Sequence, residues 1–290
     1  VRFSSQDRYI VGGNLDDSGA LAYGYTNPVA ALQWRTAPTW QLYLSAGRGF
    51  ESPTLGELAY RPDGLAGFNT ALKAQTSRQV EAGLKWRPEG AGLALDLAVF
   101  EARTEDEIGI ATNRGGRSTF RNVGRTLRQG AELDLRWRLA PQWRAQLALT
   151  ALEATYRDGF FVCRSVPCTN PDLPVPAGHR IAGTLARSGF AELVWQPLQP
   201  LELGLEVKGQ GRLPVNDVNS DFASGFGLLA LRAQWRLNLG AGRLDVLARV
   251  DNLADRRVAG SVIVNEGSAR FFEPAPGRSG LLSARWSTPF

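Results

Sequence analysis

The sequence contains no methionine, only two cysteines, one histidine and three lysines, over 290 residues. These numbers leave little material for a Cys/His metal cluster, and a serine–histidine catalytic site would depend entirely on His179. No Gly-x-Ser-x-Gly elbow accompanies that histidine. We therefore expect no catalytic residues, no metal site and no cofactor, and the protein is not expected to be an enzyme. Because the chain opens on Val1 and lacks methionine, we expect the natural chain to begin upstream.

Long hydrophobic runs are also missing. The longest stretch without a charged residue is the 17 residues from Ser18 to Trp34, and it contains two glycines and a proline. A transmembrane helix needs about 20 mostly apolar residues, so none is expected. The 32 glycines and 16 prolines disfavour long helices, and the 43% hydrophobic content argues against disorder.

The net charge of +5 comes almost entirely from arginine, since lysine occurs only at positions 73, 85 and 208. The arginines are spread singly along the chain and form no basic run. That distribution is typical of the charged faces of many strands rather than of a phosphate-binding stripe. Nucleic acid is therefore not an expected partner.

Strict alternation of apolar and polar residues runs through most of the chain. From Leu93 to Phe100 and from Leu201 to Lys208, leucines and valines occupy every second position. This period of two predicts strands with one apolar and one charged face. Twelve strands are expected, near residues 1–5, 21–35, 39–50, 76–87, 91–108, 121–139, 142–157, 180–196, 200–212, 224–238, 242–260 and 278–290.

The connections between these strands alternate between short turns and long loops, as in an up-and-down meander. The tryptophans follow the same division, because seven of them flank the short turns and the eighth lies four residues from the C-terminus. We expect all eight to form one interfacial girdle on the apolar face: Trp34, Trp40, Trp86, Trp137, Trp143, Trp195, Trp235 and Trp286.

A soluble β-sandwich also alternates apolar and polar residues. The tryptophans at one rim, the short turns opposite long loops, and strands long enough to cross a bilayer favour an all-β, antiparallel transmembrane β-barrel. Outer-membrane lipid is then a partner of the apolar face. The alternation predicts that Leu97, Leu135 and Leu205 face lipid, and that Asp96, Asp134 and Glu206 face the lumen.

Four segments resemble one family. Gly47-Arg48-Gly49-Phe50 followed by Ser52-Pro53-Thr54 and Glu57-Leu58 is similar to a segment of TonB-dependent outer-membrane receptors. Asn122-Val123-Gly124-Arg125 with Gly130-Ala131-Glu132-Leu133, Asn252-Leu253-Ala254-Asp255-Arg256, and Pro276-Gly277-Arg278 resemble later strands of that family. These matches keep the family's order along the chain.

The resemblance implies a 22-stranded barrel in the outer membrane of a Gram-negative bacterium, with a plug domain that contacts the TonB complex. Residues 1–290 would be the C-terminal portion of the barrel domain, without the plug. The implied ligands are ferric siderophores, haem, cobalamin or sugars, and a ferric siderophore or similar iron chelate is our first choice. The ligand-binding residues expected in the long outer loops are Tyr60, Arg61, Phe68, Asn69, Arg114 and Arg117, because arginine pairs with anionic chelates and aromatic rings stack on them.

Cys163 and Cys168 lie in the long loop 158–179, which we place outside the cell, where disulfides persist. We expect them to form a disulfide.

Other functions stay open at this stage. The chain could form a self-contained twelve-stranded barrel, such as an autotransporter translocator or an outer-membrane phospholipase, or a soluble adhesion-type β-domain. Pairing of Val1–Ser5 with Leu281–Phe290 would close the sheet, whereas two bare edges would make it part of a larger barrel.

Overall fold

The computed structural model describes residues 2–5, 18–62, 67–114, 117–164 and 171–288. Nearly all regular structure is β-strand, with one short helix. The elements in chain order are β1 (Arg2–Ser5), β2 (Gly19–Ala22), β3 (Val29–Ala37), β4 (Trp40–Glu51), α1 (Leu55–Leu58), β5 (Gln75–Trp86), β6 (Leu93–Glu105), β7 (Ile108–Arg114), β8 (Arg117–Asn122), β9 (Thr126–Ala140), β10 (Trp143–Tyr156), β11 (Phe160–Val162), β12 (Leu173–Val175), β13 (Arg187–Leu198), β14 (Leu201–Gln210), β15 (Leu213–Pro214), β16 (Phe222–Ala223), β17 (Phe226–Asn238), β18 (Arg243–Asp251), β19 (Ala259–Val262), β20 (Phe272–Pro274) and β21 (Ser279–Ser287).

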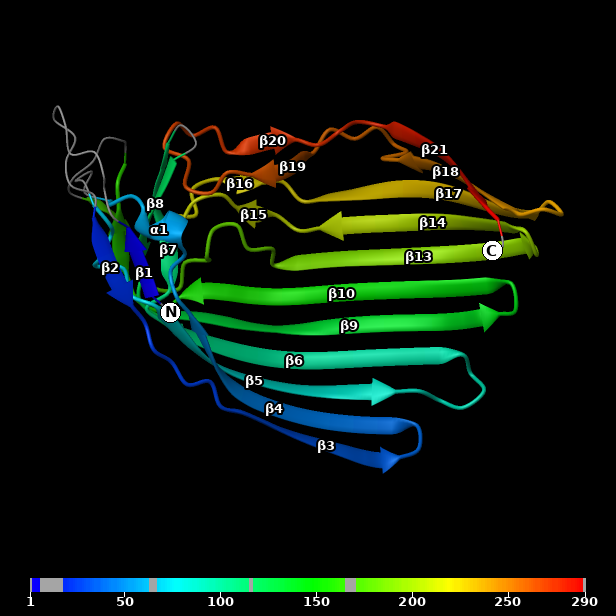
Figure 1. Ribbon diagram of the computed structural model, residues 1–290, viewed down its shortest axis with the longest axis horizontal. Coiled ribbons are helices and arrows are strands. Elements are labelled where there is room, and N and C mark those ends of the chain that lie inside the picture. The colour runs from blue at the N-terminus through cyan, green and yellow to red at the C-terminus, as the bar shows by residue number, and fades with distance from the viewer. Residues whose placement is uncertain (1, 6–17, 63–66, 115–116, 165–170, 289–290) are drawn as a thin grey trace.

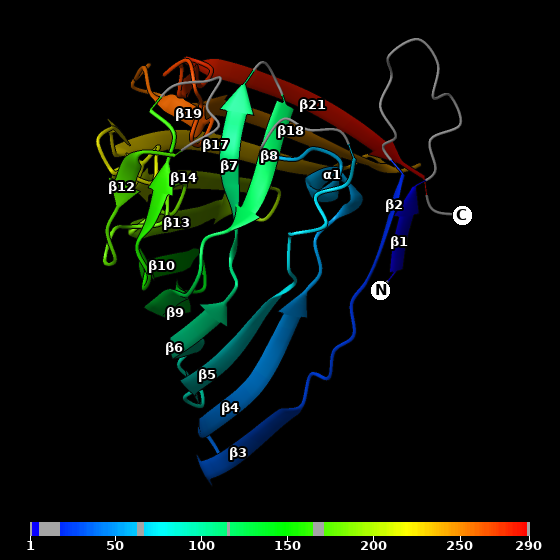
Figure 2. The ribbon, with the colours of Figure 1, turned by 90° about the vertical axis from the view of Figure 1, so that its left-hand side faces the viewer.

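Eleven long strands form one antiparallel sheet in the order β21-β18-β17-β14-β13-β10-β9-β6-β5-β4-β3 (Figure 1). Each of these strands pairs with the long strand next to it in the chain, so the sheet is an up-and-down meander. Figure 2 shows the sheet curved into an open trough, with β3 and β21 as its two edges. Short turns join the strands at one end of the trough, and the long connections gather at the other end (Figure 1).

The register places apolar and charged residues in separate rows across the sheet. Leu97 on β6 lies opposite Leu84 on β5 and Leu133 on β9. The neighbouring position, Asp96, lies opposite Lys85 and Asp134. Because alternate residues point to opposite faces, one face of the sheet is apolar and the other carries charge.

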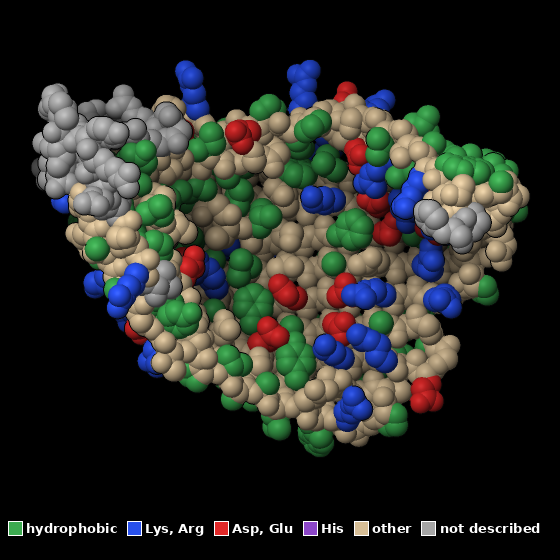
Figure 3. Space-filling model, viewed as in Figure 1, with side chains coloured by type: hydrophobic (Ala, Val, Ile, Leu, Met, Phe, Trp, Pro, Cys, Tyr) green, Lys and Arg blue, Asp and Glu red, His purple; other side chains and the backbone are tan. Residues whose placement is uncertain are grey.

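The charged face is the concave one. Figure 3 looks into the trough, and acidic and basic side chains are interspersed over its floor. Leu97 and Leu205 are about 40% exposed on the convex side, as expected of a surface that meets lipid rather than a protein core. The predicted orientations of Leu97, Leu135 and Leu205, and of Asp96, Asp134 and Glu206, agree with this register.

The tryptophans lie at the short-turn end, on the same face as the leucines. Trp40 and Trp86 are cross-strand partners with stacked rings 5.1 Å apart, and Trp143 stacks on Trp195 at 5.6 Å. Tryptophan favours the lipid–water interface, so this row is placed where a girdle would be.

Each of the twelve expected strands has a counterpart among the described residues, and eleven of these belong to the main sheet. The first expected strand lies outside the main sheet, because β1 pairs with β2 rather than with the C-terminal strand. The second expected strand, 21–35, enters the sheet only at Val29. Asn27 and Pro28 interrupt it, since proline has no amide hydrogen and restricts the residue before it.

The long connections are more structured than loops. They carry the hairpins β7–β8, β11–β12, β15–β16 and β19–β20, and the expected loop 109–120 belongs mostly to β7–β8. Two small hydrophobic clusters lie beneath them, one around Val215 and Phe271 and the other around Tyr156 and Val175. We call the hairpins, their connections and these clusters the loop cap. No helix among the described residues is long and apolar enough to cross a membrane.

Candidate functional site

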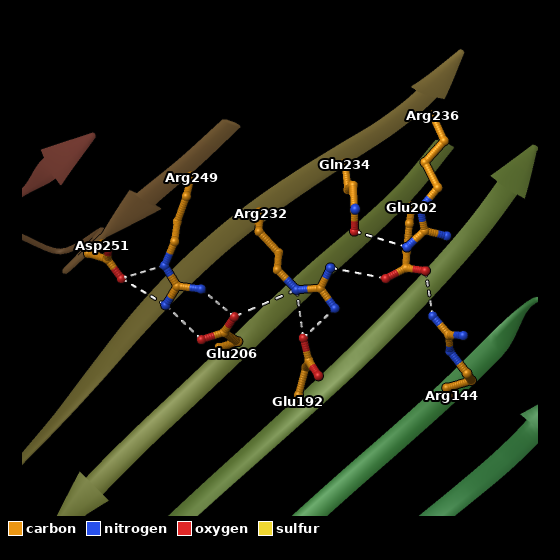
Figure 4. Close-up of polar contacts among 9 residues, drawn as sticks. All are labelled: Arg144, Glu192, Glu202, Glu206, Arg232, Gln234, Arg236, Arg249 and Asp251. Atoms are coloured by element: carbon orange, nitrogen blue, oxygen red, sulfur yellow. Dashed lines mark hydrogen bonds and ion pairs between the residues drawn. The ribbon is translucent and has the colours of Figure 1, made fainter. Parts of the chain in front are cut away.

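The floor of the trough carries a lattice of ion pairs that spans five strands, β10, β13, β14, β17 and β18 (Figure 4). Arg232 on β17 reaches Glu192 on β13 at 2.6 Å and Glu202 on β14 at 3.0 Å. Arg144 on β10 binds the other oxygen of Glu202 at 2.5 Å. Gly204 lies directly opposite Arg232, and a side chain there would meet the arginine at 2.8 Å, so glycine gives the guanidinium room to cross the sheet.

The lattice continues toward the edge of the sheet. Arg249 on β18 makes two parallel hydrogen bonds to Glu206, at 2.5 and 2.7 Å, and a third contact to Asp251 at 2.8 Å. Positive and negative groups therefore alternate across the floor. Charge-assisted, forked contacts of this kind fix the strands relative to one another and leave a polar wall for a wet lumen or a polar partner.

The segment from Ser52 to Leu58 contains the short helix α1 and the residue that caps its N-terminus. The Thr54 hydroxyl accepts a hydrogen bond from the Glu57 amide, and the Glu57 carboxylate accepts one from the Thr54 amide at 2.7 Å. This reciprocal pair is a capping box. It directs Leu58, which is fully buried, into the base of the loop cap.

Asn122 and Gly124 join three segments at the loop end of β9. The Asn122 side chain binds the backbone amide and carbonyl of Lys73 and the carbonyl of Asp106, at 2.7–3.0 Å. Gly124 has φ +87°, and a side chain there would meet the Asp158 carboxylate at 2.8 Å. Asp158 uses that space to accept hydrogen bonds from the Arg125 amide and guanidinium, and these bonds lower the pKa of Asp158.

The two C-terminal motifs contact each other. Asn252 adopts φ +49° and exchanges hydrogen bonds with the backbone of Arg256, at 2.8 and 2.9 Å. Asp255 then accepts a hydrogen bond from the Arg278 amide at 2.8 Å, which ties the end of β18 to the start of β21. The residues of the family-like motifs thus have a structural role, because their side chains hydrogen-bond to the backbone of the connections between strands.

Three long connections meet at a buried polar node. The Tyr156 hydroxyl donates to Asp217 at 2.6 Å, and Asn265 holds the other carboxylate oxygen at 2.8 Å and accepts from the Asp217 amide at 3.0 Å. His179 lies 3.2 Å from the carbonyl of Asp217. Burial raises the pKa of the Asp217 carboxyl, and the hydrogen bonds from Tyr156 and Asn265 act in the opposite direction. Sequence reasoning missed this node because its members are about 50–60 residues apart.

A small pocket of about 260 Å³ opens between residues 61–62 and 69–72 on one side and β8 on the other. Arg61 and Arg121 both line it. The Nε and Nη2 atoms of Arg121 are buried and meet no acceptor among the described residues, while Nη1 donates to the carbonyl of Phe161. The ring of Phe160 lies 4.9 Å from the guanidinium, and burial lowers the pKa of Arg121. Arg121 was not among the residues predicted from the sequence. It begins the expected strand 121–139 and directly precedes Asn122, the first residue of a family-like motif.

The six expected ligand-binding residues occupy different environments in the structure. Tyr60 is exposed and Arg61 lines the pocket, while Arg114 and Arg117 are paired residues at the end of the β7–β8 hairpin. Phe68 and Asn69 are buried, and the Asn69 side chain donates to the Phe120 carbonyl at 2.8 Å. Both therefore have little exposed surface, although Asn69 also lines the pocket, and a ligand-binding role for either residue stays a prediction. Cys168 lies outside the described residues, so its disulfide with Cys163 stays a prediction.

Several solved structures of uptake receptors and transporters share this fold. The ferric yersiniabactin uptake receptor FyuA from Yersinia pestis superposes with a TM-score of 0.71 at 17% identity, over 96% of this chain and 40% of that one. The copper transporter OprC gives 0.69 at 18%, covering 96% and 42%. The ferric-catecholate import receptor Fiu from K12 E. coli gives 0.65 at 20%, covering 93% and 36%. The chain thus spans about 40% of the length of these proteins.

The sequence model described as "TonB dependent receptor-like, beta-barrel" matches residues 1–253. The alternatives of an autotransporter translocator, a phospholipase and a soluble adhesion domain were therefore wrong. Members of the matched family are transporters rather than enzymes, and their barrels lie in the outer membrane of Gram-negative bacteria. The chain belongs to the TonB-dependent receptors and forms part of their β-barrel.

Proposed function

We propose that residues 1–290 are the C-terminal portion of a receptor barrel for TonB-dependent uptake, and that its ligand is a ferric siderophore or a similar anionic iron chelate. The TonB complex would energise uptake through a plug domain of the family's kind. Fold relatives whose names give iron chelates as cargo support this choice, and a copper transporter among them makes other metals the alternative.

The observation that carries the proposal is the Arg121 guanidinium. Two of its nitrogens are buried donors without an acceptor in the described part of the chain, beside a second arginine, Arg61, in the same pocket. A buried donor left unsatisfied costs about 1–3 kcal/mol, so an anion with several oxygens would bind there favourably. Tyr60, Arg114 and Arg117, which belong to the outer connections, are the further ligand-binding residues of this proposal.

The test uses the full-length receptor in iron-limited cells. Arg61, Arg114, Arg117 and Arg121 are replaced by alanine, surface display is checked, and binding is measured across a panel of ferric chelates. We expect at least about tenfold weaker binding of one anionic chelate, since each charge-assisted hydrogen bond contributes roughly 1.5–3 kcal/mol. Arg243→Ala, at the short-turn end, removes an exposed arginine far from the cap and should leave binding unchanged.

Normal display with unchanged binding of every chelate that the parent binds would remove these residues from the site. If the parent binds no iron chelate but takes up copper, cobalamin or a sugar, the receptor function stands and the choice of ligand is wrong.

A further inference from the structure

Three arginines lie side by side on the convex face of the sheet, in one cross-strand row. Arg48 on β4 is the register partner of Arg78 on β5, which is the partner of Arg103 on β6. Directly opposite side chains in antiparallel strands have Cβ atoms about 4.5–5.5 Å apart, and like charges in that arrangement destabilise the sheet. The row therefore needs a counter-charge.

The protein supplies little of that counter-charge. Arg103 pairs with Glu101 at 2.8 Å, but none of the ion pairs among the described residues involves Arg48 or Arg78. The row borders a hollow of about 410 Å³ that is also lined by Arg125, Arg157 and a single carboxylate, Glu105. All five arginines are exposed, and Arg125 is engaged by Asp158. The hollow is thus lined by five arginines and one carboxylate, and the three arginines of the row are exposed on the convex face.

The position of the row relative to the apolar surface identifies the kind of anion. Val80 lies two residues from Arg78 on the same face, and Leu44 and Val99 lie four residues from Arg48 and Arg103. At about 3.3 Å per residue, the arginines lie roughly 7–13 Å beyond these exposed apolar side chains, toward the long-loop end. In membrane barrels the long loops are extracellular, so the row lies at the headgroup level of the outer leaflet.

We propose that this row, Arg48, Arg78 and Arg103, with Arg125 and Arg157 beside it, binds the headgroup of an outer-leaflet lipid that carries at least two phosphates. Forked guanidinium donors match phosphate oxygens, and three adjacent cations suit a multiply charged headgroup better than a single carboxylate. The acyl chains of the same molecule would pack on the apolar side chains below the row. This site lies on the other face of the sheet from the lumenal lattice and is independent of the transported ligand.

The experiment measures lipid binding by the full-length receptor in a neutral detergent, using native mass spectrometry. The probe is bis-phosphorylated lipid A, compared with the same lipid after removal of its phosphates. The variant Arg48→Gln/Arg78→Gln/Arg103→Gln should bind the phosphorylated lipid at least about tenfold more weakly. The control Arg136→Gln/Arg138→Gln/Arg236→Gln removes three exposed arginines from the short-turn end and should bind like the parent.

The single variant Arg78→Gln keeps the proposal testable if the triple variant folds poorly. Arg78 is the central member of the row, so its loss should weaken lipid binding and, without lipid, leave thermal stability unchanged or higher because repulsion is relieved. Equal binding by parent and variants overturns the proposal. So does equal binding of the dephosphorylated lipid, and so does complete competition by millimolar inorganic phosphate, which would indicate a small-anion site instead.

Discussion

Single residues at the ends of strands determine how the long connections fold. Asn122, Asp158 and Asp255 each use a short polar side chain to hold a backbone group of a distant segment, and Asn252 holds the backbone of Arg256, four residues along the chain. Asn122, Asn252 and Asp255 belong to segments that resemble family motifs, whereas no motif includes Asp158. The physical role of all four residues follows only from their partners in the fold. A side-chain oxygen that satisfies a backbone amide far along the chain leaves no periodic signal.

Tyr156→Phe should loosen the loop cap. It removes the hydroxyl that donates to the buried Asp217 carboxylate, and an unsatisfied buried acceptor costs about 1–3 kcal/mol. The check is amide hydrogen exchange of residues 213–223 and 263–271 in the full-length receptor, with Tyr25→Phe as the control at an exposed position. Unchanged protection in Tyr156→Phe would show that the node does not hold the cap together.

The same node predicts a pH dependence. Burial raises the pKa of Asp217 above its usual value, so the folded cap binds this proton more tightly than the unfolded chain does. The contribution of Asp217 to stability is therefore largest at acid pH and falls as pH rises through the raised pKa. Protection factors of the cap should decrease from about pH 4 toward neutrality, and Asp217→Asn should flatten that decrease. A parent whose protection rises over this range would contradict the assignment.

At the scale of the strand, alternation predicted most of the sheet correctly. The eleven long strands, the faces of Leu97 and Asp96, and the row of tryptophans all follow from the period of two. The hairpins β7–β8, β11–β12, β15–β16 and β19–β20 were not predicted. They are short, and their apolar residues Phe160, Val162, Leu213 and Ala223 belong to or pack against the two hydrophobic clusters, so their pairing depends on contacts with distant residues rather than on a long local pattern.

Leu97→Arg should strongly lower the free energy of unfolding, whereas Asp96→Asn should lower it only slightly. An arginine on the lipid face near the midplane costs about 2–4 kcal/mol. Asp96 pairs with Arg87 at 2.8 Å on the lumenal side, where an exposed ion pair contributes only about 0–1 kcal/mol. Urea unfolding of the full-length barrel refolded in lipid vesicles measures both. Similar losses for the two variants would reverse the assignment of faces.

At the scale of the whole molecule, the sheet has two edges. β3 and β21, of nine residues each, end the eleven-stranded sheet without a further partner among the described residues. In lipid, each unsatisfied backbone group costs several kcal/mol, which is why membrane sheets close. The fold could be recognised from the sequence. Whether the sheet closes into a barrel could not, because pairing between strands far apart in the chain leaves no pattern in the sequence of either strand.

Residues 1–290 produced alone should therefore not insert as a stable monomeric barrel. We expect aggregation or pairing of copies through the exposed edges, whereas the full-length receptor should insert. Insertion into vesicles is followed by protease protection and by heat-modifiable migration on gels. A protected, heat-modifiable monomer of the 290 residues would mean that the chain closes by itself.

The lumenal lattice and the buried node also favour the correct register when the strands pair. A strand that slips by two residues keeps every leucine outside and every charge inside, so the alternation that defines the sheet cannot detect the error. The same slip moves a side chain along its strand by about 7 Å, beyond the reach of an ion pair or hydrogen bond. Arg232 would then miss Glu192 and Glu202, and Tyr156 would miss Asp217. These contacts therefore stabilise the correct register over a register shifted by two residues, and they form only when the strands that carry them have paired.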